Sequence, residues 1–239
     1  MEVITEAALR ALRPLGVAAF EVPPGAYVTA EARRYAQEQG IALRETGWGA
    51  MSRTPIDTKA PEPYVDAETG AGYAQKPENM THLRGNLLVP KTHPRIALRG
   101  QLDLLQGHII LLQAKAAERR QAALCQDLGE LLAFVRAILA AEVKEEPMPP
   151  FSLLGLDAAG LRRASHDIKG TCGMEHPVPD YRMGALCAGL NLLRAQAREA
   201  ELWAARAFET GGGETILLAL NRLSSAVYLL FCKEVKNHG

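Results

Sequence analysis

The distribution of proline divides this chain more sharply than any other feature of the sequence. Of the 14 prolines, six lie between Pro55 and Pro94, whereas none lies at residues 95–146 or after Pro179. A proline inside a helix removes a backbone hydrogen bond and clashes with the preceding turn. Long helices are therefore disfavoured in the first region and permitted in the other two, and we expect a helical domain at residues 91–239.

Hydrophobic periodicity predicts five helices in this domain. Apolar residues recur every three to four positions along each segment, which is typical of a helix with one buried face. The predicted helices begin at Pro94 and near residue 119, and then cover residues 157–166, 180–208 and 214–235. Asp157 and Asp180 are suited to be N-caps, and a glycine run at 211–213 separates the last two helices. Five helices with short connections predict a mainly α fold, a five-helix bundle.

Two segments precede the bundle. Residues 1–45 predict a small N-terminal helix-strand appendage, with a strand at Phe20–Val22 and a helix that Thr29 caps and Gly40 ends. Residues 46–90 are rich in Gly, Pro and Thr and show no sheet signal, so they predict a long loop. Long ordered loops often carry function, and we expect this one to take part in binding.

Composition excludes several classes of function. Lys plus Arg equals Asp plus Glu at 27 each, so no net charge attracts nucleic acid or a membrane surface, and an anionic ligand needs a local cluster of cations. The first ten residues lack the apolar core of a secretory signal, and polar residues interrupt the most apolar stretches. The four cysteines show no metal or redox spacing, which indicates a reduced cytoplasmic protein.

Polar residues on otherwise apolar helices are the candidates for chemistry. Arg194, Arg198 and Glu201 stand at i, i+4 and i+7, so they share one helical face. Asn221 interrupts an apolar run, where a buried amide without a partner costs about 1–3 kcal/mol. For the spacing alone, a solvated salt-bridge stripe is the simpler interpretation of the first three residues. Asn221 can likewise be a device that fixes the pairing of the helices.

Three motifs occur in a fixed order along the helices. They are Lys91–Arg95 followed by Gly100–Asp103, then the Arg-x-x-x-Arg-x-x-Glu run Arg194–Glu201, and then the Asn-Arg-Leu-Ser run within Leu220–Ser224. Together they resemble the signature of the ATP:cob(I)alamin adenosyltransferases. The ethanolamine-utilisation type is the most similar group within that family, because further similarity occurs at Met80–Leu83, Gly155–Asp157, Val178–Pro179 and Leu192–Arg194 and extends to pieces of the N-terminal segment.

The resemblance implies a reaction. The 5′-deoxyadenosyl group of ATP passes to cob(I)alamin, which gives adenosylcobalamin and triphosphate, with ethanolamine ammonia-lyase as the consumer of the product. It implies Mg²⁺ with ATP, a homo-oligomer (a trimer is favoured) with sites between subunits, and ethanolamine ammonia-lyase or its reactivase as a partner. The location is the cytoplasm or a bacterial microcompartment. Because cob(I)alamin is itself a strong nucleophile, the protein has only to align the substrates, neutralise the triphosphate and exclude water.

The resemblance also assigns roles to residues. Arg194, Arg198 and Asn221 are the expected catalytic residues, since arginine forks suit phosphate oxygens and a carboxylate such as Glu201 suits Mg²⁺. Asp103 is expected to form a buried ion pair with Arg194. The other candidates for the ATP site are Lys91, Lys76, Thr81 and His82, and those for the corrinoid site are Phe151, Met174, His176 and Val178. A histidine in a surface loop is an equally good interpretation of His176.

The middle segment departs from the pattern of this family. Well-known members carry a histidine and three cysteines there as a metal site, whereas residues 46–90 contain no cysteine and only one histidine, His82. The Gly-rich ATP loop of the other adenosyltransferase group is also missing. We therefore expect no zinc or iron. The loss keeps an alternative open, a non-catalytic corrinoid-binding protein or scaffold that retains the bundle.

Overall fold

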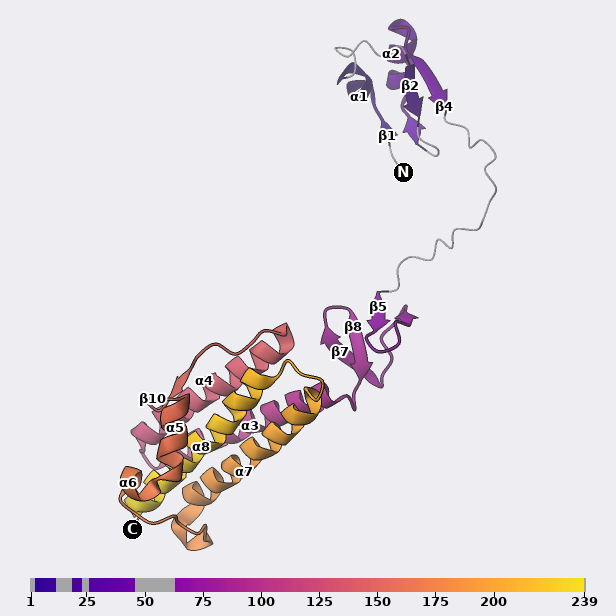
Figure 1. Ribbon diagram of the computed structural model, residues 1–239. Coiled ribbons are helices and arrows are strands. Elements are labelled where there is room, and N and C mark those ends of the chain that lie inside the picture. The colour runs from indigo at the N-terminus through magenta and orange to yellow at the C-terminus, as the bar shows by residue number, and fades with distance from the viewer. Residues whose placement is uncertain (1–2, 12–18, 23–25, 46–62, 239) are drawn as a thin grey trace. The chain divides into compact units, whose positions relative to one another are not determined.

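The computed structural model describes residues 3–11, 19–22, 26–45 and 63–238 (Figure 1). The chain forms two compact units, residues 1–59 and 60–239. The first unit is a small α/β arrangement with a core of its own around Leu9, Ala32 and Tyr35. Its elements are β1 (Val3–Ile4), α1 (Glu6–Ala11), β2 (Ala19–Val22), β3 (Tyr27–Val28), α2 (Ala30–Glu38) and β4 (Ala42–Glu45).

The N-terminal unit contains the expected strand and the expected helix after Thr29, together with further strands that the sequence did not predict. The strands form two parallel pairs, β1 with β3 and β2 with β4. Thr29 is the N-cap of α2, because its Oγ1 accepts a hydrogen bond from the Ala32 N–H at 3.2 Å. Parallel pairing joins segments that are separated by a helix, so strands of two to four residues leave no local pattern.

A four-stranded sheet opens the second unit, where the sequence predicted a loop. Its strands are β5 (Tyr64–Asp66), β6 (Gly72–Tyr73), β7 (Met80–Arg84) and β8 (Leu87–Pro90), in the order β6-β5-β8-β7. The loop prediction for residues 46–90 is therefore wrong from residue 64 onward, and residues 46–62 lie outside the described part. The parallel pair β5–β8 joins Val65 to Leu87, so the register depends on distant residues that local alternation does not reveal.

Six helices make up the bundle in the described part of the second unit (Figure 1). They are α3 (Pro94–Glu118), α4 (Ala122–Lys144), α5 (Ala158–His166), α6 (Ile168–Cys172), α7 (Gly184–Ala207) and α8 (Glu214–His238). A hairpin of β9 (Ser152–Leu153) and β10 (Leu156–Asp157) precedes α5, and a 3-10 turn, η2 (Tyr181–Met183), precedes α7. The prediction of a mainly α helical bundle is confirmed, and the short helix α6 and the hairpin are additions to it.

The helix ends follow the capping residues. His93 accepts a hydrogen bond at Nδ1 from the Arg95 N–H at 3.2 Å, and Pro94 occupies the first turn of α3. The Asp157 carboxylate accepts one from the Gly160 N–H at 2.6 Å and starts α5 as expected. Asp180, however, caps η2 rather than the long helix. α7 begins only at Gly184, whose φ of +88° turns the chain between the two.

Helix α8 contacts most of the bundle. It packs against α4, α5, α6 and α7, whereas α3 packs against α4 and α7. Among the described residues, α8 is also the one helix long and apolar enough to cross a membrane. Within the bundle, 56% of the most apolar 18-residue stretch of α8 is buried. This burial is the ordinary pattern of a core helix in a helical bundle.

A buried carboxylate joins α3 to α4 near the sheet. Glu142 on α4 is completely shielded from solvent, and its two oxygens accept hydrogen bonds from Arg95 Nε at 2.6 Å and Arg99 Nε at 2.5 Å. Because both oxygens are paired with guanidinium groups, the negative charge is compensated inside the fold. The motif residue Arg95 therefore has a structural contact in this chain.

The same guanidinium groups attach the sheet to the bundle. Arg99 donates to the backbone carbonyls of His82 and Leu83 in β7, at 3.1 and 2.8 Å. Glu145, the residue directly after α4, accepts hydrogen bonds from Arg95 and from Arg84 of β7, each at 2.6 Å. The hydrogen bond from Arg95 lowers the pKa of Glu145. The end of the bundle where α3 begins is thus held to β7 by charged contacts.

Candidate functional site

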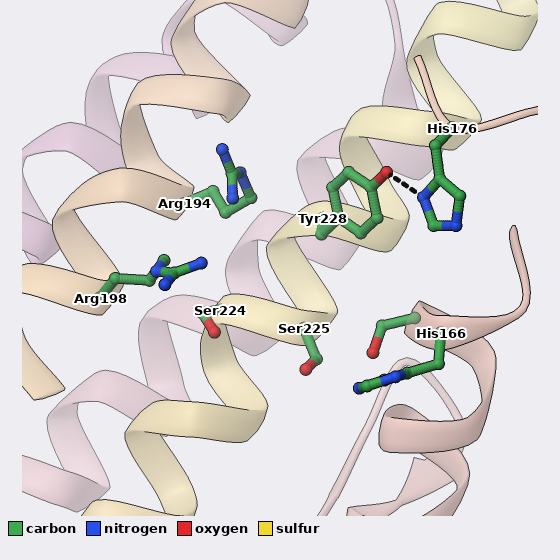
Figure 2. Close-up of a pocket in the computed structure, with 8 residues that line it drawn as sticks. His166, His176, Arg194, Arg198, Ser224, Ser225 and Tyr228 are labelled. Atoms are coloured by element: carbon green, nitrogen blue, oxygen red, sulfur yellow. Dashed lines mark hydrogen bonds between the residues drawn. The ribbon is translucent and has the colours of Figure 1, made fainter. Parts of the chain in front are cut away.

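A pocket of about 350 Å³ opens between α5, the α6–η2 connection, α7 and α8 (Figure 2). Two arginines project into it from α7, and two serines and a tyrosine line it from α8. We call it the arginine pocket. Its lining residues are Ser165, His166, His176, Arg194, Arg198, Ser224, Ser225 and Tyr228.

The pattern of burial on α7 places the two arginines. The inward face of α7 includes the buried residues Leu193 and Ala197. Each arginine directly follows one of them and is therefore turned about 100° away from the core, towards the pocket. Arg194 is half-buried and lies over the Tyr228 ring, with its guanidinium carbon 5.7 Å from the ring centroid. Its Nη2 donates to Asn191 at 3.2 Å, while its buried Nε has no partner.

Tyr228 connects the two sides of the pocket. His176 Nδ1 lies 2.7 Å from the Tyr228 hydroxyl, and the two rings are stacked with 8° between their planes. Burial raises the pKa of Tyr228 to about 12, so the phenol stays protonated at neutral pH and can donate to the imidazole. This hydrogen bond ties the α6–η2 connection to α8.

The other motif residues, Asn221, Arg222 and Glu201, contact one another but do not line the pocket. Asn221 Nδ2 donates to Glu201 Oε1 at 2.8 Å, which joins α8 to α7, and Arg222 donates to the Asn221 side-chain oxygen. Ser224, which lines the pocket, donates to the Asn221 backbone carbonyl at 2.8 Å. Arg198 has no hydrogen-bond or ion-pair partner in the described part of the chain. The arrangement therefore differs from the salt-bridge stripe that the spacing alone suggested.

The charge of the arginine pocket is one-sided. None of its eight lining residues is acidic, and it contains two guanidinium groups, two imidazoles and four hydroxyls. Arginine forks bind oxyanions through two parallel hydrogen bonds, whereas the four hydroxyls already form hydrogen bonds within the protein. Its volume lies in the range of small-molecule sites. The pocket is therefore suited to an anion with several oxygens.

Comparison with known proteins identifies the family. Residues 73–234, more than half of the chain, match the model of a family described as cobalamin adenosyltransferase. This chain belongs to the cobalamin adenosyltransferase family. It is 30% identical to the corrinoid adenosyltransferase EutT of Salmonella typhimurium strain LT2, over 98% of this chain and 93% of the relative. It is also 30% identical to EutT of Escherichia coli K12, over 97% and 92%. No solved structure matches it.

The expected ion pair of this adenosyltransferase is absent within one chain. Asp103 is exposed on α3 and forms no ion pair with any described residue, so the prediction of a buried Asp103–Arg194 pair is wrong for the single subunit. Leu102 and Leu105 occupy the inward face of α3, and a residue directly after Leu102 is turned about 100° away from it. Arg194 instead lies on the Tyr228 ring.

The four candidates on the sheet side do not line the arginine pocket. His82 in β7 and the flanking Lys76 and Lys91 are exposed, and Thr81 is half-buried in the β7–β8 ladder. His82 Nδ1 contacts the Gly85 carbonyl at 3.0 Å, and Lys91 lies 3.9 Å from a carboxylate oxygen of an exposed glutamate. A single chain therefore leaves these residues outside the pocket.

The corrinoid candidates separate in the structure. His176 lines the arginine pocket, whereas Met174 packs against the bundle core and Val178 is 80% exposed. Phe151 packs against Phe134 with ring centroids 4.7 Å apart and lines a different, apolar pocket beside α5 and α8. His176 is exposed in the α6–η2 connection and also lines the pocket, so its position fits both interpretations.

Sequence reasoning missed four lining residues, Ser165, His166, Ser225 and Tyr228. Tyr228 carries a signal, because it stands seven residues after Asn221 and so on the same face of the helix. Ser225 directly follows the Asn-Arg-Leu-Ser motif. The last turn of α5, with Ser165 and His166, reaches the pocket only through tertiary packing of α5 on α8. No local pattern marks that pair.

Proposed function

We propose that the protein is a corrinoid adenosyltransferase that transfers the 5′-deoxyadenosyl group of ATP to cob(I)alamin. The products are adenosylcobalamin and triphosphate. The observation that carries the proposal is the pair of uncompensated arginines in one pocket, Arg194 and Arg198. They belong to a chain that is similar over nearly its whole length to relatives named as corrinoid adenosyltransferases.

The reaction does not require a covalent contribution from the protein. The cobalt of cob(I)alamin provides the electron pair that attacks the 5′ carbon of the ribose, and the triphosphate leaves with the pair of the broken C–O bond. The leaving group therefore keeps its negative charge, and cations that hold it lower the barrier. In this proposal Arg194 and Arg198 bind the phosphate oxygens, and Asn221 fixes the side chain of Glu201 beside them.

The residues around Glu201 fit a magnesium ion. One carboxylate oxygen accepts the hydrogen bond from Asn221, and the group forms no ion pair with a described residue. Mg²⁺ usually takes one or two protein carboxylates and completes its shell with phosphate oxygens and water. We propose that Glu201 holds Mg²⁺ on the ATP phosphates, where the ion neutralises part of their charge. Arg198 stands three residues earlier on the same helix.

We further propose a homo-oligomer, with a trimer favoured, in which sheet residues of one subunit complete the pocket of the next. The candidates Lys76, Thr81, His82 and Lys91 stay outside the pocket of their own chain. Helices α3 and α7 also expose large apolar side chains that a monomer leaves in water: Leu104, Ile110, Leu111, Leu192 and Leu202 are 48–59% exposed. Size-exclusion chromatography with light scattering tests the oligomer, and a monomer at micromolar concentration would contradict it.

The destination of the product follows from the subgroup. Because the motifs resemble the ethanolamine-utilisation type, we propose that adenosylcobalamin passes to ethanolamine ammonia-lyase, with that enzyme or its reactivase as a partner. The reaction then takes place in the cytoplasm or in a bacterial microcompartment.

A spectroscopic assay tests the activity directly. The purified protein is incubated with ATP, Mg²⁺ and chemically reduced cobalamin, and the visible spectrum is followed. We expect the cob(I)alamin bands to be replaced by those of adenosylcobalamin, and no change when ATP is omitted. Binding of cobalamin without any turnover would contradict the proposal and support the alternative, a non-catalytic corrinoid-binding protein.

A further inference from the structure

We infer that His166 and His176 form the second wall of the triphosphate subsite, opposite the two arginines. The inference deepens the proposed function and rests on it. It assigns ligand contacts to α5 and to the α6–η2 connection, two parts of the chain that carry none of the motifs. The geometry that supports it is the position of both imidazoles in the arginine pocket (Figure 2).

The unused hydrogen-bonding capacity of the pocket is the first argument. Arg194 has a buried Nε without a partner, and the exposed Arg198 forms no hydrogen bond or ion pair with a described residue. A buried polar group without a partner costs about 1–3 kcal/mol, so the Arg194 Nε favours an acceptor from outside the chain, and Arg198 beside it can bind the same ligand. No lining carboxylate competes for these donors.

The state of His176 is the second argument. Its Nδ1 is engaged by the Tyr228 hydroxyl, which stays protonated and can donate. With Nδ1 as the acceptor, a neutral imidazole carries its proton on Nε2. That N–H is then a donor for a ligand. Stacking on Tyr228 fixes the ring, so the donor is held in place before any ligand arrives.

His166 closes the pocket from the other side. It is the last residue of α5, has no hydrogen-bond partner in the described part of the chain, and points towards Ser225 in Figure 2. Ser165 beside it also lines the pocket. An imidazole that no protein group engages is free to contact a ligand oxygen.

The charge of the pocket favours a polyphosphate over a single phosphate ester. Cobalamin also carries one phosphate, in its nucleotide loop, but that phosphodiester has one negative charge. The four lining hydroxyls already form hydrogen bonds within the protein, whereas the two guanidinium groups carry two positive charges, more than one phosphodiester neutralises. A triphosphate offers several charged oxygens to each wall. We therefore assign the histidines to the triphosphate of ATP and of the product.

Binding of inorganic tripolyphosphate tests the inference without turnover. Calorimetric titrations compare the wild type with His166→Gln and His176→Gln. Each substitution should weaken binding roughly tenfold, because a hydrogen bond to a charged group is lost. Lys169→Gln is the matched control, since this exposed α6 lysine pairs with Glu175 at 2.7 Å and does not line the pocket. It should bind as the wild type does. Far-UV circular dichroism checks that all variants fold.

A second titration separates the two sources of phosphate. Cob(II)alamin and cob(II)inamide, which lacks the nucleotide phosphate, are titrated into the same variants. Equal affinities of wild type and histidine variants for both corrinoids, with weakened tripolyphosphate binding, support the inference. Weakened cobalamin binding with unchanged tripolyphosphate and cobinamide binding would overturn it in favour of the nucleotide loop. Unchanged tripolyphosphate binding in both variants would also overturn it, while an active wild type leaves the proposed function standing.

Discussion

Glu201 accepts a hydrogen bond from Asn221 at 2.8 Å across the contact between α7 and α8, and it does not pair with Arg198 on its own helix. A salt bridge along α7 would consume both charges. The amide instead holds the carboxylate, and the guanidinium is left for a ligand. This arrangement favours the proposed binding site over a surface salt-bridge stripe, and the first two predictions rest on it.

Arg198→Ala should lower kcat/KM for ATP about 30-fold or more. A desolvated charged contact to a phosphate contributes ~2 kcal/mol or more, whereas a solvated arginine contributes well under ~1 kcal/mol. Arg206→Ala is the matched control, because this arginine near the end of α7 is exposed and only covers Trp203, with 4.8 Å from its guanidinium carbon to the ring centroid. Steady-state kinetics measure kcat/KM for ATP in both variants. Equal values would show that Arg198 does not contact ATP.

Asn221→Ala should impair turnover by releasing Glu201, and the loss should be larger at low Mg²⁺. The same hydrogen bond contributes only about 1 kcal/mol to folding, so the melting temperature should change little. Glu201→Gln and the double variant complete a cycle of kinetic measurements. Because the two residues act as a unit, the double variant should lose little more than the worse single variant. Additive losses would show that the two residues act separately.

Glu142→Gln should destabilise the protein by about 3–5 kcal/mol, since it leaves the guanidinium groups of Arg95 and Arg99 without their buried counter-charge. Glu118→Gln is the control, because this glutamate lies exposed at the end of α3. Chemical denaturation followed by circular dichroism measures both. A loss below ~1 kcal/mol in Glu142→Gln would mean that the cluster positions the sheet without stabilising the bundle.

Glu145 should make the stability depend on acid. The hydrogen bond from Arg95 lowers the pKa of Glu145 below its ordinary value. A lowered pKa gives a contribution that is complete above the unfolded-state pKa and is lost as the pH falls through the folded-state pKa. The melting-temperature difference between wild type and Glu145→Gln should therefore be constant above pH 4.5 and shrink below it. Glu146→Gln, at the exposed neighbour, should show no such dependence.

Activity should require Mg²⁺ and neither zinc nor iron. Residues 46–90 contain no cysteine, and no group of three or more His, Cys, Asp or Glu side chains in the described part of the chain is arranged to hold a metal ion. Elemental analysis of active protein should find both metals well below one per chain. Stoichiometric zinc or iron, with activity lost on its removal, would refute this prediction.

The helices of the bundle were predictable because their signals are local. Proline at position 94, the cap at Asp157 and the apolar repeat each act within a few residues, and the structure has a helix in each of the five expected places. Asp180 shows the limit of such signals. A capping side chain indicates that a turn begins, but the glycine at 184 decides how far the helix proper is delayed.

The sheet and half of the pocket were not predictable from local signals. Strand β5 pairs in parallel with β8 across the two intervening strands β6 and β7, and Gly, Pro and Thr in that segment are equally common in loops. Motif residues supplied Arg194, Arg198 and Ser224. The opposite wall comes from α5 and the α6–η2 connection. His176 in that connection was a candidate, whereas His166 meets the arginines only because α5 packs on α8. The prediction of an Asp103–Arg194 pair is wrong for the single subunit, because helical spacing shows which residues share a face of one helix but not which residue of another helix lies opposite them.

The central position of α8 has a consequence for how the protein is made. Helices α4, α5, α6 and α7 all bury apolar side chains against α8, which is the last of these helices to leave the ribosome. Until it emerges, the earlier helices expose the surfaces that would otherwise be covered. The nascent chain therefore passes through a stage with a half-open interior, at which chaperone binding competes with aggregation. Translation that stalls between α7 and α8 should leave a product that degrades rather than a smaller stable bundle.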